Sequence, residues 1–131
     1  MLYVSCPMTS IYQEIILDHY RNPRNQGELK VPTYAAAMNN PTCGDKLEMQ
    51  ILVKNDIIED VKFKGSGCAI SQASASILTE FLKGKSLEEA KRLKKDDLLD
   101  LLGIELSLTR LKCALLSLET FQKSLQKPLQ K

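Results

Sequence analysis

The chain has 131 residues, a length that fits one domain with a hydrophobic core of its own. Apolar residues make up 44% of it and charged residues 26%, which is typical of a globular protein and argues against disorder. The net charge is only +2, and the short basic run at residues 91–95 contains no aromatic residue, so a nucleic-acid-binding surface is not expected. No apolar run approaches the roughly 20 residues that span a membrane.

The first residues lack the basic and apolar regions of a signal peptide, so we expect a cytoplasmic location. The four cysteines are then expected to be reduced thiols rather than disulfides, because cytosolic thiol buffers keep them reduced. In that compartment clustered cysteines suggest a metal site or a reactive thiol.

In chain order, the first predicted element is a helix over residues 10–20, with apolar residues at helical spacing and Ser10 as its N-cap. Asn22-Pro23 should end this helix, because the residue before a proline disfavours the helical conformation. We expect residues 1–131 to form a single domain in which residues 1–9 are flexible.

Strands follow. Apolar and polar residues alternate over residues 47–54, the period of a half-buried strand. Asn55-Asp56 is placed for a tight hairpin turn into a return strand over residues 58–64. Residues 35–38 are a candidate for a third strand.

The rest of the chain is predicted to be helical. A helix over residues 69–83 should end at Gly84, and Ser86 begins a capping-box pattern for a second helix. Asp96 is a candidate cap for a short third helix, and leucines at steps of three or four predict a long C-terminal helix over residues 108–125. Strands followed by helices predict an α+β fold, with a small antiparallel sheet of about three strands covered on one face by helices.

Three cysteines lie at predicted element ends. Cys43 is in a turn between strands, Cys68 is where the last strand meets a helix, and Cys113 is near the start of the C-terminal helix. A cysteine at a helix N-terminus meets unpaired backbone N–H groups, which favour its thiolate. With Asp45, the three thiolates supply four ligands for zinc or for a small iron–sulfur cluster. We hypothesise that the harder oxygen ligand of Asp45 makes a cluster easier to release.

The alternative is that each cysteine is simply a small buried apolar residue, which is common in folded proteins. Spacing alone does not favour the metal site, because the chain contains no compact C-x₂-C pair. Cys6 lies outside any motif and is interpreted as incidental. His19, the only histidine, is interpreted as a helix-face residue rather than a ligand.

Four motifs, taken together, favour the metal site over the alternative of simply buried cysteines. They are DHYRNPRN at residues 18–25, NPTCGD at 40–45, GSGCAISQASAS at 65–76 and RLKCALL at 110–116. In this order and at compatible spacing they resemble the scaffold family of iron–sulfur cluster assembly, which includes IscU, SufU and the N-terminal domain of NifU. The resemblance covers residues 10–121, nearly the whole chain.

The resemblance implies a specific activity. Family members accept sulfur as a persulfide from a cysteine desulfurase, combine it with iron as a transient [2Fe-2S] cluster, and pass the cluster to apo-proteins. Isolated members often carry zinc in the same site. Carried over by motif, the ligands are Cys43, Asp45, Cys68 and Cys113, and the persulfide acceptor is Cys43, as in SufU, or Cys113, as in IscU.

The chain is similar to SufU in motif and to IscU in length. Gly67-Cys68-Ala69 and Lys112-Cys113 resemble SufU, whereas IscU-like members usually have a histidine at the position of Lys112. IscU-like members also carry a Leu-Pro-Pro-Val-Lys stretch for an Hsp70-type chaperone, and residues 107–110 contain no proline, which argues against dependence on that chaperone. The interval from Cys68 to Cys113 leaves no room for the SufU insertion. Lys112 is interpreted as a solvated helix residue, or as a cation that offsets the negative charge of the site.

Three rival functions stay open at this point. The first is a zinc-dependent sulfur relay similar to SufU, in which the site mainly passes sulfur on. A structural zinc-binding interaction module would have a closed site whose removal unfolds the protein. A redox thiol protein is disfavoured because no C-x-x-C pair is present. A scaffold predicts an exchangeable site that takes part in sulfur transfer.

Overall fold

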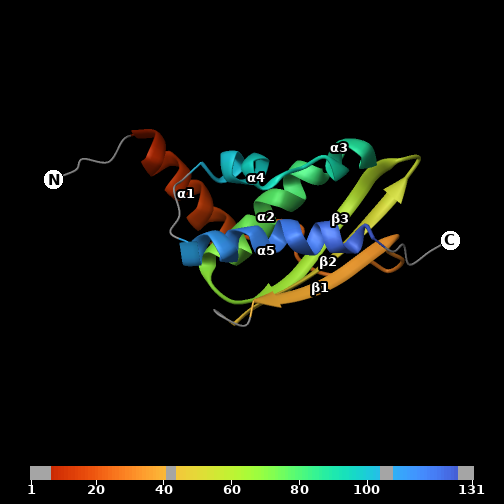
Figure 1. Ribbon diagram of the computed structural model, residues 1–131, viewed down its shortest axis with the longest axis horizontal. Coiled ribbons are helices and arrows are strands. Elements are labelled where there is room, and N and C mark those ends of the chain that lie inside the picture. The colour runs from red at the N-terminus through yellow and green to blue at the C-terminus, as the bar shows by residue number, and fades with distance from the viewer. Residues whose placement is uncertain (1–6, 41–43, 104–107, 127–131) are drawn as a thin grey trace.

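A three-stranded antiparallel sheet forms one layer of the protein (Figure 1). The computed structural model describes residues 7–40, 44–103 and 108–126, and gives only the backbone of residues 7–13 and 108–110. The strands are β1 (Tyr34–Asn40), β2 (Asp45–Lys54) and β3 (Ile57–Ser66), in the spatial order β1-β2-β3. The predicted small antiparallel sheet is confirmed.

The β2–β3 hairpin turns at the two predicted residues. Asn55 and Asp56 both have positive φ angles, of 53° and 63°, which a two-residue hairpin turn of type I′ requires. The alternating pattern then directs one side of each strand inward, where Met49, Ile51 and Val61 have no exposed surface.

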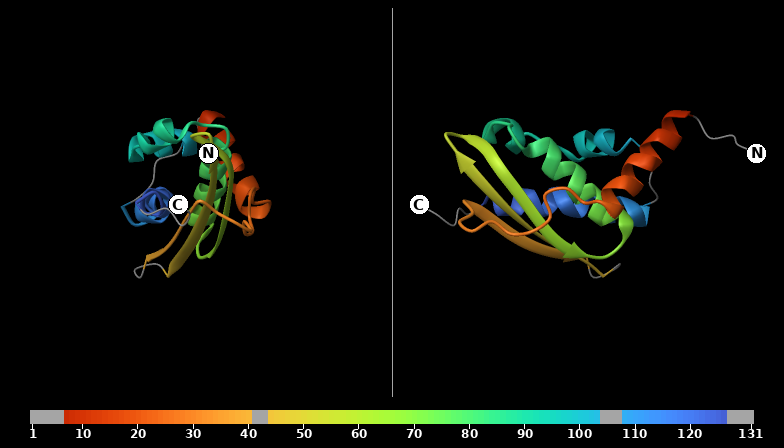
Figure 2. Two further views of the ribbon diagram at one scale, coloured as in Figure 1. Left: turned by 90° about the vertical axis from the view of Figure 1, so that its right-hand side faces the viewer. Right: turned by 180° about the vertical axis from the view of Figure 1, so that it is seen from behind.

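Helices cover that inner face of the sheet. They are α1 (Pro7–Arg21), α2 (Ala69–Leu82), α3 (Leu87–Lys91), α4 (Lys95–Leu102) and α5 (Leu108–Ser124). Helices α2 and α5 contact both the sheet and each other, and α1 packs against α2 (Figure 2). The α+β class with helices on one face, including an N-terminal helix and a long C-terminal helix, is confirmed.

Helix α2 is the central element of the helical layer. Every residue from Ser71 to Thr79 is buried. Its small side chains allow neighbouring helices to approach closely, and its hydroxyl groups are hydrogen-bonded because a buried polar group without a partner is costly. Ser74 is hydrogen-bonded to α5. Ser76 is hydrogen-bonded to His19 of α1 and to Arg24, which follows α1. Helix α2 therefore links the elements around it.

The segment between α1 and β1 crosses the other face of the sheet (Figure 2). It first runs along the outer edge of β3, where the N–H of Phe63 donates to Asn25 and the N–H of Gly27 donates to Phe63, both at 2.9 Å. The N–H of Leu29 then donates to the side chain of Gln50, an outward-facing residue of β2, at 2.6 Å. These bonds fix a segment that has no regular structure of its own.

Some of the predicted helix boundaries are observed, and others are not. Ser86 caps α3 as predicted, since its Oγ accepts from the N–H of Glu89 at 3.1 Å. Gly84 has a positive φ, of 85°, which suits the predicted helix end, although α2 already ends at Leu82. The predicted cap at Ser10 is wrong, because α1 already begins at Pro7.

The predicted cap at Asp96 is also wrong. Helix α4 begins at Lys95, so Asp96 is its second residue. The third residue, Asp97, reaches back instead and accepts from the N–H of Lys94 at 2.9 Å. The N-cap of α4 is thus Lys94, and Asp97 supplies the side-chain bond of a capping box.

The core has two parts. The larger lies between the sheet and helices α2, α4 and α5. A smaller cluster lies nearer the Asp45 end of β2 and comprises Leu47, Phe63, Ala75 and Leu116, with Met38 packed against it. Among the described residues, no helix combines the length and apolar character needed to cross a membrane.

Candidate metal centre

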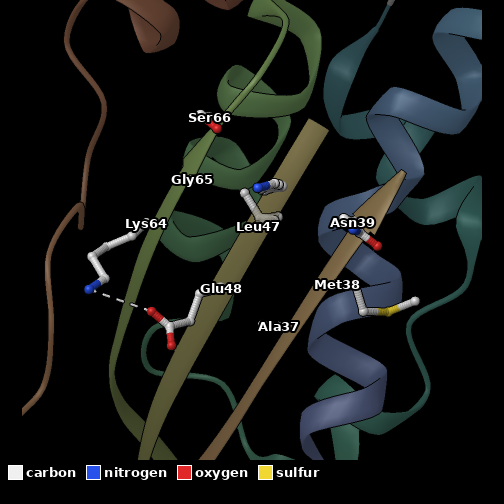
Figure 3. A pocket seen from close by; sticks show the side chains of 9 residues that line it. Ala37, Met38, Asn39, Leu47, Glu48, Lys64, Gly65 and Ser66 are labelled. Carbon is white, nitrogen blue, oxygen red and sulfur yellow. Dashed lines mark ion pairs between the residues drawn. The ribbon is translucent and has the colours of Figure 1, made fainter. Parts of the chain in front are cut away.

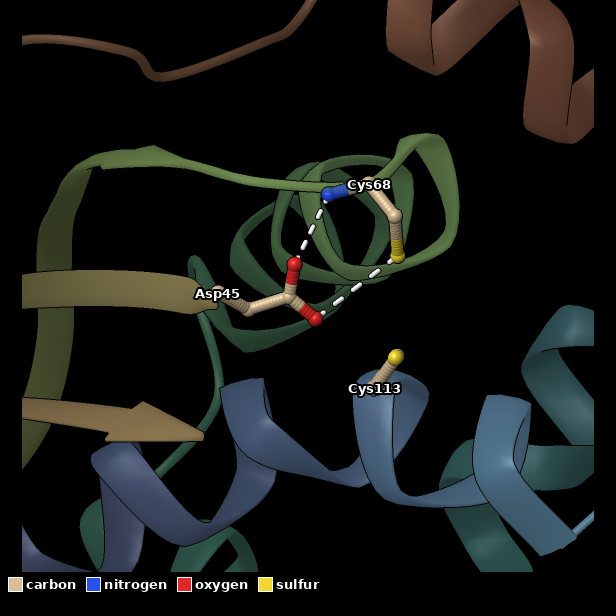
Figure 4. A group of neighbouring side chains, drawn as sticks. All are labelled: Asp45, Cys68 and Cys113. Atoms are coloured by element: carbon tan, nitrogen blue, oxygen red, sulfur yellow. Dashed lines mark hydrogen bonds between the residues drawn. The ribbon is translucent and has the colours of Figure 1, made fainter. Parts of the chain in front are cut away.

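Asp45, the first residue of β2, is fully buried at the end of the sheet. Its Oδ1 accepts the backbone N–H of Cys68 at 2.8 Å, and its Oδ2 lies 3.7 Å from Cys68 Sγ (Figure 4). A buried carboxylate is stable only with such partners. The hydrogen bond to Oδ1 directs Oδ2 toward the thiols, so the geometry suits coordination through one oxygen.

Cys68 is the N-cap residue of α2 and is partly exposed. Its extended backbone, with φ −73° and ψ 163°, joins β3 to the helix. The Ser71 hydroxyl donates to the Cys68 carbonyl at 3.0 Å and braces this first turn. The positive end of the helix dipole favours an anionic ligand here.

Cys113 lies in the N-terminal part of α5 and points toward the same place (Figure 4). Only 3% of its surface is exposed. As one of the two predicted persulfide acceptors, it is thus less accessible than Cys68. Cys43, the other predicted acceptor and the fourth predicted ligand, lies outside the described residues, as does Cys6.

Asp45, Cys68 and Cys113 form one cluster. Each offers a ligand atom, and these atoms all lie within 4.8 Å of one another. A tetrahedral zinc site with Zn–S bonds of about 2.3 Å needs sulfur atoms about 3.8 Å apart, so small movements would complete the geometry. Two thiolates and a carboxylate are suitable ligands for zinc and for iron. The residues present therefore fit a metal ion.

Two glycines allow β3 to pass close to Asp45. Gly67 has a φ of 139°, and a Cβ atom there would overlap the Asp45 carboxylate. At Gly65, a Cβ atom would overlap the Lys46 carbonyl group. These glycines therefore accommodate the Asp45 side chain and the strand that carries it.

His19 is not part of the cluster. It is buried between α1 and α2, where its Nδ1 lies 2.7 Å from Ser76 Oγ and its Nε2 lies 3.4 Å from Glu80 Oε1. Because the N–H of Arg24 already donates to Ser76 Oγ at 2.9 Å, the Ser76 hydroxyl is available to donate to His19. The interpretation of His19 as a helix-face residue is confirmed, and Arg24 belongs to the same helix-end structure.

His19 gives the stability of the protein a pH dependence. Burial lowers the pKa of His19, and the nearby Arg24 lowers it further, while Glu80 and Asp18 oppose this. The unfolded chain, with a histidine pKa of about 6.5, then binds more protons than the folded one. We expect the free energy of unfolding to be highest above that pH and to fall as the pH decreases below it, by at most about 1.4 kcal/mol per pH unit.

Urea unfolding between pH 5 and 8 measures this effect. As the chain has one histidine, NMR titration gives the pKa of His19 directly. The His19→Asn variant should show a flatter profile over the same range. Equal slopes for the two proteins would contradict the assignment.

A hollow of about 740 Å³ opens beside the cluster at the same end of the sheet (Figure 3). All three strands line it, with Lys46 next to Asp45 and Ser66 next to Gly67. Glu48 and Lys64 form an ion pair of 3.6 Å along one side. The surface near Asp45 is therefore concave, with a lining that is more apolar than polar apart from its charged side chains.

The sequence was compared with known proteins. Residues 11–131 match the NifU-like N-terminal domain family. The zinc-dependent sulfurtransferase SufU of Bacillus subtilis is 39% identical, over 92% of each chain. The iron–sulfur cluster assembly scaffold protein IscU of Haemophilus influenzae is 44% identical, over 81% of this chain and 86% of its own.

A solved structure agrees. The putative iron–sulfur cluster assembly scaffold protein for the SUF system from Fervidobacterium islandicum superposes with a TM-score of 0.74 at 29% identity, over 88% of this chain and 97% of its own. The fold, the converging candidate ligands and the family match over residues 11–131 lead to one conclusion: this chain belongs to the NifU-like N-terminal domain family.

Proposed function

We propose that the chain, as a single domain, is a scaffold for iron–sulfur cluster assembly. It receives sulfur from a cysteine desulfurase and iron as substrates, and holds the nascent [2Fe-2S] cluster on Cys43, Asp45, Cys68 and Cys113. The observation that carries the proposal is the convergence of Asp45, Cys68 and Cys113, which are far apart in sequence, within 4.8 Å. The kinship to proteins named as scaffolds supports it.

Sulfur transfer requires an accessible thiolate. The thiolate attacks the terminal sulfur of the desulfurase persulfide, a new S–S bond forms, the old one breaks, and the desulfurase cysteine leaves as a thiolate. This exchange needs no external oxidant or reductant. Building the cluster also requires reduction of the persulfide sulfur to sulfide, with electrons from ferrous iron and from a thiol such as excess cysteine. The burial of Cys113 supports Cys43 over Cys113 as the first acceptor.

A zinc-dependent sulfur relay is the second candidate. Its specific support is the kinship to a protein named as a zinc-dependent sulfurtransferase, together with Lys112 beside Cys113. When bound, zinc would stabilise the thiolates at neutral pH. In this function the sulfur would pass on to another acceptor instead of being built into a cluster on the chain.

The proposed partners follow from this chemistry. They are a cysteine desulfurase and apo-proteins that accept the cluster, and an Hsp70-type chaperone is not included because residues 107–110 contain no proline. Both candidate functions need reduced thiols, which fits a location in the reducing cytoplasm.

The experiment combines the protein with a cysteine desulfurase, cysteine and ferrous iron without oxygen. Visible absorbance reports cluster formation on the chain, and desulfurase turnover reports sulfur acceptance. A scaffold should show both, whereas a relay should raise turnover with little cluster on the chain. Single replacements of Cys43, Asp45, Cys68 and Cys113 are expected to reduce the signal.

Cys6→Ser is the matched control, since it removes a cysteine outside the motifs and should behave like the parent. If the four site variants also behaved like the parent, the site would be assigned wrongly. A parent protein that neither forms a cluster nor stimulates the desulfurase would contradict both functions.

A further inference from the structure

The three residues of the metal centre are not all held in place in the same way. Asp45 and Cys68 are tied to each other directly, by the bond from the Cys68 N–H to Asp45 Oδ1 and by the close passage at Gly67. Cys113 comes from α5, and its place relative to Cys68 is set by how α5 packs on α2. Whatever fixes that packing also fixes the distance between the two thiols.

Small residues of both helices belong to the buried clusters that α2 and α5 share. Ala73 and Ala75 of α2 and Ala114 of α5 are all fully buried there or nearby. Apolar packing of small side chains is non-directional, so by itself it specifies the register of two helices weakly. A directional bond between the helices is needed to set their relative position.

Ser74 supplies this bond. Its hydroxyl is fully buried and donates to the Ala114 carbonyl of α5 at 2.7 Å. Ser117 joins the same network, with its Oγ 3.0 Å from Ser74 Oγ and 3.3 Å from the Ala114 carbonyl. Ala114 directly follows Cys113, so the hydroxyl group holds the backbone of α5 one residue beyond the candidate ligand.

We propose that Ser74 is a positioning residue of the metal centre. Its hydroxyl fixes α5 against α2 so that Cys113 Sγ lies within bonding range of an ion held by Asp45 and Cys68. The demand on position is strict, because metal–ligand distances tolerate only about 0.2 Å. This inference rests on the proposed function only in taking the cluster to be a metal site.

The test compares three variants that each remove one buried hydroxyl. Ser74→Ala removes the bond between the helices, and Ser117→Ala removes its neighbour. Ser124→Ala is the matched control, because Ser124 is also buried and its hydroxyl donates at 2.6 Å to Phe121 within its own helix. Zinc affinity is measured by competition with a chelator, without a desulfurase, and the metal-free unfolding free energy by urea titration.

Ser74→Ala is expected to weaken zinc binding about tenfold, at the lower end of what loss of a supporting hydrogen bond costs at metal sites. The thiolate-to-metal absorption of its cobalt form should also shift in energy and intensity. Ser117→Ala should show a smaller change in the same direction. Ser124→Ala should keep the parental affinity and spectrum, even if its unfolding free energy falls as much.

Parental affinity and an unchanged cobalt spectrum in Ser74→Ala would overturn the inference and leave the proposed function standing. Equal losses in Ser74→Ala and Ser124→Ala would also overturn it, since the effect would then be general destabilisation. A parent protein that binds no zinc or cobalt would instead overturn the metal centre itself. Should Ser74→Ala fail to fold, Ser117→Ala decides by the same two measurements.

Discussion

Replacement of Gly67 by alanine is expected to lower the zinc affinity at least tenfold and to reduce the free energy of unfolding by about 2–4 kcal/mol. Two effects add. A φ of 139° is a conformation that side chains other than hydrogen rarely adopt, and the new Cβ would overlap the Asp45 carboxylate. Relief of the overlap must move either Asp45 or the start of α2, and each carries a ligand.

Gly84→Ala separates these two effects. Gly84 also has a positive φ, of 85°, but a Cβ atom there would meet nothing within 4 Å. This variant should lose about 1 kcal/mol of unfolding free energy through backbone strain alone and should keep its zinc affinity. Chelator competition and urea unfolding of both variants are the measurements, and a Gly67→Ala variant with the affinity of Gly84→Ala would disprove the close-passage argument.

Asp45 is expected to have two roles that different substitutions separate. Asp45→Ala and Asp45→Asn both remove the anionic ligand, so each should weaken zinc binding by about 10–100-fold or more. Only asparagine keeps an acceptor for the Cys68 N–H. Without metal, Asp45→Asn should therefore be more stable than Asp45→Ala by about 1 kcal/mol, the lower end of the cost of leaving a buried donor without a partner, because the Cys68 N–H is only partly buried.

The measurements are zinc affinity and urea unfolding of the metal-free proteins. Equal stability of the two variants would show that the bond to Cys68 contributes nothing to the fold. A third substitution, Asp45→Cys, tests the ligand role by replacing the carboxylate with a thiolate. The site then offers four thiolates, and we expect it to release the cluster to an apo-protein more slowly than the parent does.

Local patterns were sufficient to predict the sheet and most of the helices. The alternation in β2, the Asn55-Asp56 turn and the Ser86 cap each depend on neighbouring residues, which a sequence displays directly. The start of α1 was missed because Ser10 is a good cap by residue type, yet the helix already begins at Pro7. Boundaries of this kind depend on context that residue preferences do not contain.

The sequence predicted that Asp45, Cys68 and Cys113 would converge, but not the contacts that hold them in place. Asp45, Cys68 and Cys113 could be identified because the motifs around them mark them out. The contact of Gly67 with Asp45 and the bond from Ser74 to Ala114 join residues far apart in the chain. No periodicity or short motif reports such contacts, so they became visible only in the folded chain.

The three described candidate ligands come from β2, the N-cap of α2 and α5, which are spread over much of the chain. A bound ion would therefore act as a crosslink between the sheet and two helices, and local opening of any one of the three would break it. Metal binding should raise the stability of the whole domain, by RT ln(1 + [metal]/Kd), instead of that of a single loop. In hydrogen exchange, protection would then increase together in the sheet and in both helices when zinc is added.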